Sequence, residues 1–267
     1  MNIYIVFLLL ISIIIFLYIV NLYIVNLSFK THNISENFSM NNIIFIDSEK
    51  LLNTLSNDND NYYKTFFTND LMTRKIKNIE EYTDLIKLST SNFTESEKNK
   101  IQKCISKIYP IFKKLKLDWF DGNKANKIQW KIGCVKNKLY EHGLPHTRGD
   151  LIIISSEDVN KFSDEKLMKT FIHEKVHVYQ KLYPNDMEIY LNNNKFIKYK
   201  LRDKNDNIRA NPDLNNWIYK DNDNNIYQAL YNKDPSSIED IKYLPINNQS
   251  YEHPFEKMAI EIEDSIN

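Results

Sequence analysis

The residues best suited to chemistry lie between His173 and His177, where the chain reads His-Glu-Lys-Val-His. Residues four apart in a helix share one face, with Cβ atoms roughly 6 Å apart, so two imidazoles at this spacing can bind one metal ion. Glu174 follows at about 100° around the helix axis, outside the ligand pair but within reach of a water molecule on the metal. The spacing predicts one zinc ion on His173 and His177, with Glu174 as the general base.

This combination predicts hydrolysis of an amide bond. Zinc can lower the pKa of a bound water to about 7, and a nearby carboxylate can accept its proton during attack on a polarised carbonyl. The carboxylate can then protonate the leaving nitrogen. We therefore expect a zinc hydrolase that cleaves a peptide or protein substrate through a zinc-bound water activated by Glu174. The competing interpretation is that both histidines are ordinary polar residues on a half-exposed helix.

A hydrolytic zinc site also needs a third protein ligand and an open fourth position. The best source is residues 251–259, where Pro254 can start a helix and Glu256 lies in its first turn. The small Ala259 would let this helix approach the first one closely. Glu256 is therefore predicted as the third ligand, although acidic residues are also favoured at helix N-termini without any metal. Lesser candidates are Glu252 and His253.

Hydrophobic periodicity and capping residues indicate which elements position these groups. Helices are expected over residues 48–55, 79–88, 95–115 with a kink at Pro110, 164–182 after a cap at Ser163, and from Pro254 onward. Strands are expected over residues 128–132 and 151–154, and a hairpin over 217–220 and 226–230. This order of elements predicts an α+β domain.

The N-terminus is apolar. Residues 1–29 carry no charged side chain, and roughly 20 apolar residues suffice to span a bilayer. We expect a transmembrane anchor over residues 1–27, a polar tether over 28–42 and one domain over 43–267. A cleaved signal peptide is the alternative, but a basic n-region and an Ala-x-Ala-like cleavage site are both missing. The protein is thus predicted to be a single-pass membrane protein, of a viral or host membrane, with its sidedness open.

The charge balance and the cysteine content argue against a nucleic-acid-binding protein and against a disulfide-stabilised fold. Lys plus Arg and Asp plus Glu each total 35, so the formal net charge is zero and no nucleic-acid partner is expected. The two cysteines, Cys104 and Cys134, are too few for a disulfide scaffold. One bridge or two buried free thiols are both compatible with the sequence.

Residues 173–180 match the pattern HExxHxxQ, and residues 254–259 match Pro-x-Glu-x-x-Ala. Together they resemble the zincin metallopeptidases of the gluzincin type, in their compact form. Residues 144–154, Leu-Pro-His-Thr-Arg-Gly-Asp-Leu-Ile-Ile-Ile, resemble the edge strand and the central strand of the zincin sheet. The resemblance implies a zincin-like domain with a small mixed sheet, an active-site helix and a C-terminal ligand helix, behind the N-terminal transmembrane helix.

In that family the edge strand borders the cleft and pairs with an extended substrate. The resemblance therefore implies that Leu144, His146 and Thr147 bind the substrate main chain. Residues 209–213 either line the cleft or form a turn around Pro212.

The sequence departs from the larger gluzincins in one respect. Many of these carry an Asp four residues after the third ligand, which orients a histidine ligand. Ile260 occupies that place here, so the orienting carboxylate is unassigned. The donor that stabilises the oxyanion is also unassigned, the candidates being His146, Tyr219, Tyr227 and Tyr251.

Two other functions compete with a peptidase. One is a catalytically inactive zincin-like protein that serves as a binding or structural component of a membrane or virion. The other is a membrane-anchored interaction protein with a fortuitous motif, which would bind no metal. The presence of Glu174 favours the enzyme, because an inactive relative has no physical need for the base.

Overall fold

The computed structural model describes residues 16–21, 42–245 and 251–266. The chain divides into two units between Met40 and Asn41, and residues 16–21 of the first unit are helical. Within the described residues, no helix is both long enough and apolar enough to cross a membrane. Most of the expected anchor and tether lies outside the described residues, so both stay predictions.

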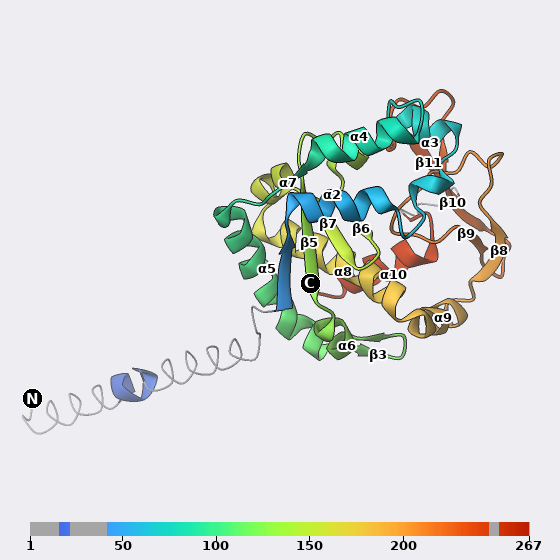
Figure 1. The fold of residues 1–267 in the computed structure, drawn as a ribbon. Coiled ribbons are helices and arrows are strands. Elements are labelled where there is room, and N and C mark those ends of the chain that lie inside the picture. Colours follow the sequence, from blue (N-terminus) through green and yellow to red (C-terminus); the bar gives the residue numbers. More distant parts are fainter. Residues whose placement is uncertain (1–15, 22–41, 246–250, 267) are drawn as a thin grey trace, which may run out of the picture. The chain divides into compact units, whose positions relative to one another are not determined.

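The second unit is built around a mixed sheet with the strand order β1-β5-β7-β6 (Figure 1). Its strands are β1 (Ile43–Ile46), β5 (Trp130–Val135), β7 (Leu151–Ser155) and β6 (His146–Arg148), with β2 (Thr90–Ser91) paired to the end of β5. The first three are parallel, whereas β6 runs antiparallel to β7 at the edge. Every residue of β7 is buried, as expected for a strand that is covered on both faces.

Helices cover both faces of this sheet. α2 (Ser48–Asn57) and α4 (Ile79–Ser89) lie on one face, and α5 (Glu95–Lys114) and α8 (Asp164–Leu182) lie on the other. Gly133 of β5 lets α2 come close, because a Cβ atom there would lie 2.6 Å from a methyl group of Leu51. On the opposite face the ring of Trp130 packs against Phe171 of α8, with centroids 6.1 Å apart.

Side-chain caps fix where the long helices begin. Thr94 and Glu97 form a capping box at the start of α5, and the Ser163 hydroxyl accepts a hydrogen bond from the Lys166 amide at the start of α8. α5 continues through Pro110, and α8 ends at Leu182. The cap at Ser163 therefore fixes the residue at which α8 begins.

A second, antiparallel sheet has the order β11-β10-β9-β8. Its strands are β8 (Ile197–Leu201), β9 (Trp217–Lys220), β10 (Ile226–Tyr231) and β11 (Ile241–Leu244). α9 (Pro184–Asn193) connects α8 to this sheet, and α10 (Pro254–Asp264) follows it. The loop between β8 and β9 is tied to β10, because the Arg209 amide donates to Ala229 O at 2.9 Å.

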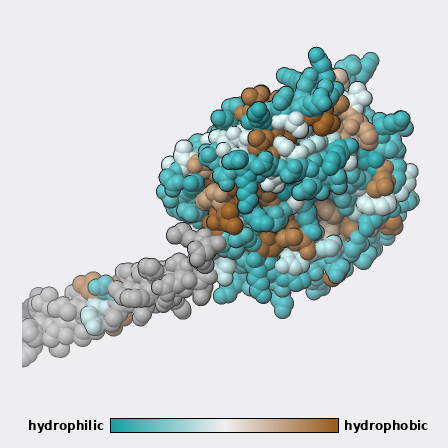
Figure 2. Space-filling model, viewed as in Figure 1, coloured by the Kyte–Doolittle hydropathy of each residue, from teal (hydrophilic) through white to brown (hydrophobic). Residues whose placement is uncertain are grey.

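Shorter elements complete the second unit. They are η2 (Tyr63–Thr65), α3 (Thr68–Thr73), β3 (Lys116–Leu117), β4 (Phe120–Asp121), α6 (Gly122–Lys127), η3 (Tyr140–Gly143) and α7 (Ser156–Lys161). The face of this unit in Figure 2 is mostly hydrophilic, with apolar side chains scattered over it. This distribution is expected when most apolar side chains pack between the sheet and its helices.

The structure confirms the predicted α+β class and most of the predicted elements. The expected strand at residues 128–132 lies instead at Trp130–Val135, because Ile128 is the C-cap residue of α6. The sequence did not predict strands β1, β2, β3, β4, β8 and β11 or helices α3, α6, α7 and α9. Cys104 and Cys134 are both buried and free, and burial raises the pKa of each thiol to about 12.

Candidate metal centre

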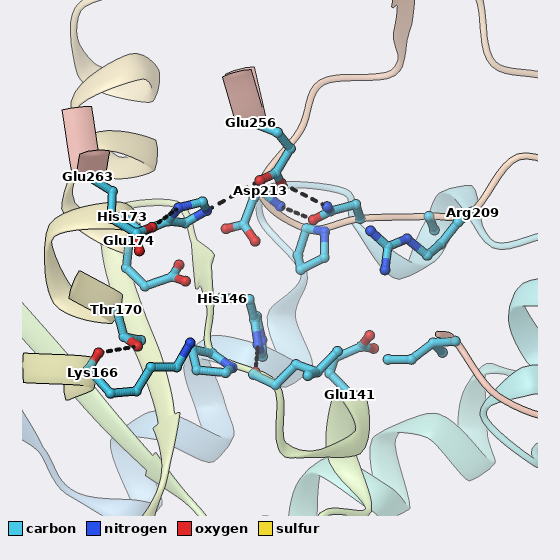
Figure 3. A pocket seen from close by; sticks show the side chains of 16 residues that line it. Glu141, His146, Lys166, Thr170, His173, Glu174, Arg209, Asp213, Glu256 and Glu263 are labelled. Atoms are coloured by element: carbon cyan, nitrogen blue, oxygen red, sulfur yellow. Dashed lines mark hydrogen bonds and ion pairs between the residues drawn. The ribbon is translucent and has the colours of Figure 1, made fainter. Parts of the chain in front are cut away.

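The predicted ligands come from two helices that pack against each other. α8 presents His173 and His177 one turn apart on the same face, and α10 presents Glu256 in its first turn. Met258 and Ala259 of α10 are fully buried. The small side chain of Ala259 leaves room for the two helices to approach, which brings the three candidate ligand side chains together. Figure 3 shows two of them, His173 and Glu256, facing each other.

The three ligand atoms have the separations of a zinc site. His173 Nε2 lies 3.1 Å from His177 Nε2 and 3.2 Å from Glu256 Oε2, and His177 Nε2 lies 3.6 Å from that oxygen. Two ligands on one tetrahedral zinc ion, bonded at roughly 2.0–2.1 Å, lie about 3.3–3.4 Å apart. The residues present therefore fit a zinc ion.

The hydrogen bonds on the far side of each imidazole point to the same conclusion. Nδ1 of His173 faces Glu263 Oε2 at 3.2 Å, and Nδ1 of His177 faces Gln180 Oε1 at 2.9 Å. Both partners are acceptors, so the proton of each neutral imidazole is assigned to Nδ1. Two Nε2 lone pairs then face each other, which is unfavourable unless a proton or a cation lies between them.

The electrostatic interactions within the cluster also favour a cation between the candidate ligands. Burial disfavours a protonated His173, but Glu256 and Glu263 outweigh burial and raise its pKa well above the usual value. Burial likewise disfavours an ionised Glu256, yet His177 and His173 hold the pKa of this carboxyl well below its usual range. The cluster thus favours a positive charge at its centre, which zinc would supply.

Further residues hold each ligand in place. Gln180 donates through Nε2 to Phe255 O at 2.9 Å while its carbonyl oxygen accepts from His177, so it links α8 to the start of α10. The Asn211 amide donates to Glu256 Oε1 at 3.1 Å. Glu263, two turns after Glu256, offers the orienting carboxylate that the sequence left unassigned.

Glu174, the predicted general base, lies in the cavity beside the candidate ligands. It lines the same cavity as His173 and Glu256 and is only 4% exposed. Its Oε2 atom has no hydrogen-bond partner among the described residues. Burial and the nearby Asp213 raise the pKa of Glu174 well above its usual range. Because no other group in the described part of the chain forms a hydrogen bond with this oxygen, it can form one with a molecule inside the cavity.

The cavity beside the triad has a volume of about 320 Å³. Leu144 and His146 of the predicted substrate strand line it. Thr147 is not part of the lining. Its amide and its hydroxyl both donate to Asp213 Oδ1 at 2.6 Å, so the open edge of β6 is already occupied at this residue.

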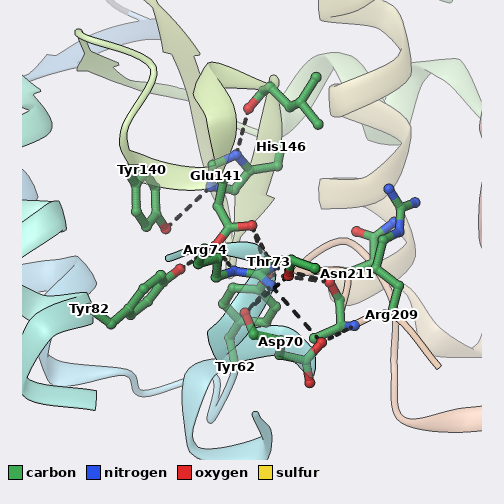
Figure 4. Close-up of polar contacts among 12 residues, drawn as sticks. Tyr62, Asp70, Thr73, Arg74, Tyr82, Tyr140, Glu141, His146, Arg209 and Asn211 are labelled. Atoms are coloured by element: carbon green, nitrogen blue, oxygen red, sulfur yellow. Dashed lines mark hydrogen bonds and ion pairs between the residues drawn. The ribbon is translucent and has the colours of Figure 1, made fainter. Parts of the chain in front are cut away.

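A buried ion pair lies at one wall of the cavity (Figure 4). The Arg74 guanidinium donates to both oxygens of Glu141, at 2.8 and 2.7 Å, and Tyr62 and Tyr82 donate to the same carboxylate. Burial alone would raise the pKa of Glu141, but Arg74 lowers it to about 2. Glu141 lines the cavity, and its contacts fix the turn that precedes His146.

The lesser ligand candidates are engaged elsewhere. His253 caps α10 by accepting from the Phe255 amide at 3.1 Å, and its Nε2 faces Trp217 O at 3.1 Å. Burial lowers the pKa of His253 to about 3. Glu252 accepts hydrogen bonds from Arg209 and Asn211. The structure thus leaves Glu256 as the third member of the cluster.

Some of the other residues that the sequence suggested for the cleft line the cavity, and some do not. Residues 209–213, for which the sequence allowed either a cleft role or a plain turn, all line it. Of the candidate oxyanion donors, His146 lines it, whereas Tyr219, Tyr227 and Tyr251 do not. Arg209 and Asn211 also carry N–H donors in the lining, and neither was singled out as a donor from the sequence.

No protein-family model, curated protein or solved structure matches this chain.

Proposed function

We propose that this chain is a zinc-dependent metallopeptidase, tethered to a membrane through its N-terminal segment. The observation that carries the proposal is the convergence of His173, His177 and Glu256 at zinc-like separations, with both Nδ1 atoms facing acceptors. Two imidazole lone pairs aimed at one point, beside a carboxylate, form a donor set that suits zinc.

Each residue has a definite role in this proposal. His173, His177 and Glu256 would hold the zinc ion, which when bound supplies Lewis acidity toward water and toward the scissile carbonyl. Glu174 accepts a proton on its free Oε2 atom and returns it to the leaving nitrogen. Glu263 and Gln180 keep the two imidazoles in the orientation that directs Nε2 inward.

The proposed substrate is an extended peptide that lies in the cavity beside β6. Leu144 and His146 are placed to contact its main chain, because both line the cavity. We do not extend this role to Thr147, whose amide and hydroxyl are taken by Asp213. An edge strand, an adjacent active-site helix and a C-terminal ligand helix are the arrangement expected of a zincin-like domain.

The first test is metal analysis of the full-length protein. The wild type should bind one zinc ion, and His173→Ala or His177→Ala should lose it, because two remaining ligands hold the ion far more weakly than three. Gln129→Ala, a substitution outside the triad, serves as the control and should retain zinc. Full zinc occupancy in either histidine variant would refute the ligand assignment.

The second test is cleavage of a mixed peptide library. Glu174→Gln nearly matches the native side chain and should retain zinc, but turnover should fall by roughly two or more powers of ten, the range expected on losing a positioned base. Equal cleavage by wild type and variant would exclude Glu174 as the base. Zinc binding without any cleavage by the wild type would favour a zincin-like binding protein.

A further inference from the structure

Arg209 places a partly buried cation at the wall of the cavity beside the candidate metal centre. Its side chain is 15% exposed, and one of its terminal nitrogens donates to Glu252 Oε1. Figure 3 shows the guanidinium directed from the backbone toward the interior of the cavity. The backbone is fixed at this point, because the Arg209 amide donates to Ala229 O of β10.

The guanidinium is not fully satisfied. Its Nε atom is buried and has no hydrogen-bond partner among the described residues. The oxygen of Glu252 that it contacts also accepts from the Asn211 amide at 2.9 Å, so the one carboxylate contact is shared. A buried N–H of a charged group without an acceptor is costly. An acceptor that enters the cavity would remove this cost.

Five carboxylates line the cavity, those of Glu141, Glu174, Asp213, Glu256 and Glu263, and the last two contact His173. Glu141 is neutralised by Arg74 at 2.7 Å. Asp213 lies close enough to Lys181 to interact electrostatically with its ammonium. These two carboxylates therefore have cations of their own, and a planar guanidinium is the side chain best matched to a further carboxylate.

We propose that Arg209 is a specificity-determining residue that binds a carboxylate group of the peptide substrate. This inference rests on the proposed peptidase function. The carboxylate has two sources, the C-terminus of the peptide or an Asp or Glu side chain within it. The first source would make the protein release short C-terminal fragments, whereas the second would direct cleavage to acidic sequences.

The experiment measures binding, so that it does not depend on turnover. The full-length, zinc-loaded protein carrying Glu174→Gln is titrated into four fluorescent alanine-rich peptides. One has a free C-terminus, one has a C-terminal amide, and two amidated peptides carry a single internal Glu or Gln. A carboxylate on Arg209 should tighten binding roughly tenfold to a hundredfold over the neutral counterpart. The pair that shows this difference identifies the source of the carboxylate.

Variants assign the effect to Arg209. Arg209→Met in the same background should abolish the difference between acidic and neutral peptides, whereas Lys166→Met, which removes another cation of the same cavity, should keep it. Arg209→Lys retains the charge without the planar fork and should keep only part of the preference. Zinc content and thermal unfolding are measured for each variant, and Arg209→Lys decides the matter if Arg209→Met does not fold.

Each outcome bears on a separate claim. Equal binding of acidic and neutral peptides, binding of none of them, or a preference that persists in Arg209→Met would overturn the role of Arg209. Wild-type cleavage of neutral peptides without acidic preference would overturn this role and leave the peptidase intact. A carboxylate preference in binding, with no cleavage by the wild type, would support Arg209 and overturn the peptidase.

Discussion

Nδ1 of His173 lies 3.2 Å from Oε2 of Glu263, a residue two helical turns beyond the proposed third ligand, Glu256. These two carboxylates of α10 therefore contact the same imidazole, one on each of its ring nitrogens. The orienting role that an Asp four residues after the ligand would have is thus open to Glu263. One face of α10 supplies both a candidate ligand and the group that orients another.

The first prediction follows from this contact. Glu263→Gln should weaken zinc binding by roughly tenfold to a hundredfold, because the neutral amide can still accept from Nδ1 but lacks the negative charge that makes Nε2 a stronger donor to the metal. Glu261→Gln is the matched control, since its carboxylate lies on the same helix but contacts Tyr190 and Lys257. Zinc competition with a chelating dye measures both affinities. Equal affinities in the two variants would remove Glu263 from the site.

The second prediction concerns metal removal. A chelator should lower the free energy of unfolding by about 3 to 4 kcal/mol relative to protein with free zinc at roughly 100 to 1,000 times its dissociation constant. The reason is that zinc would bind the folded chain and hold α8 and α10 together at His173, His177 and Glu256. Thermal unfolding with and without chelator measures the change. The same chelator should leave the unfolding of His177→Ala unaltered, and an equal shift there would show that the metal lies elsewhere.

Local sequence signals predicted the parts of the site that lie within single helices. Ser163 marks the start of α8, the four-residue spacing places both histidines on one face of this helix, and Pro254 marks the start of α10. Contacts between distant segments were not predictable. Glu263 was missed because its partner lies 90 residues away, and a glutamate at a helix surface is usually solvated.

The same limit applies to the substrate strand and to the sheet. The position of β6 followed from the family resemblance, but nothing near Thr147 shows that Asp213, 66 residues later, occupies its amide. Strand β1 was missed because its four residues directly follow the polar stretch expected to be a tether. Its partner β5 lies far along the chain, so no local periodicity reveals the pairing.

The third prediction separates the ligand from its neighbours on α10. Glu256→Ala should abolish zinc binding, because it removes one of three ligands. His253→Ala should keep zinc bound while lowering the free energy of unfolding by about 1 kcal/mol or more, since it deletes the cap on the Phe255 amide. Metal analysis and urea unfolding measure the two effects. Loss of zinc in His253→Ala, with Glu256→Ala still loaded, would exchange their roles.

The fourth prediction is a pH dependence of stability from the buried pair Arg74 and Glu141. Arg74 lowers the pKa of Glu141 from its usual value of 4.5 to about 2. The ionised carboxylate therefore stabilises the fold fully above pH 4.5, and this stabilisation is lost as the pH falls toward 2. A shift of this size corresponds to about 3 kcal/mol. Urea unfolding at a series of pH values should show this loss.

Substitutions test whether the Glu141 carboxylate causes this acid-induced loss of stability. Glu141→Gln should be less stable than the wild type by about 3 to 5 kcal/mol near neutral pH, because it leaves the Arg74 guanidinium buried without its counter-charge. It should also lack the corresponding part of the acid-induced loss. Glu80→Gln, on the exposed side of α4, should keep the wild-type pH dependence. If Glu141→Gln does not fold, Tyr82→Phe removes one hydrogen bond to the carboxylate and should move the loss to higher pH. An unchanged pH dependence in both variants would show that Glu141 does not control acid stability.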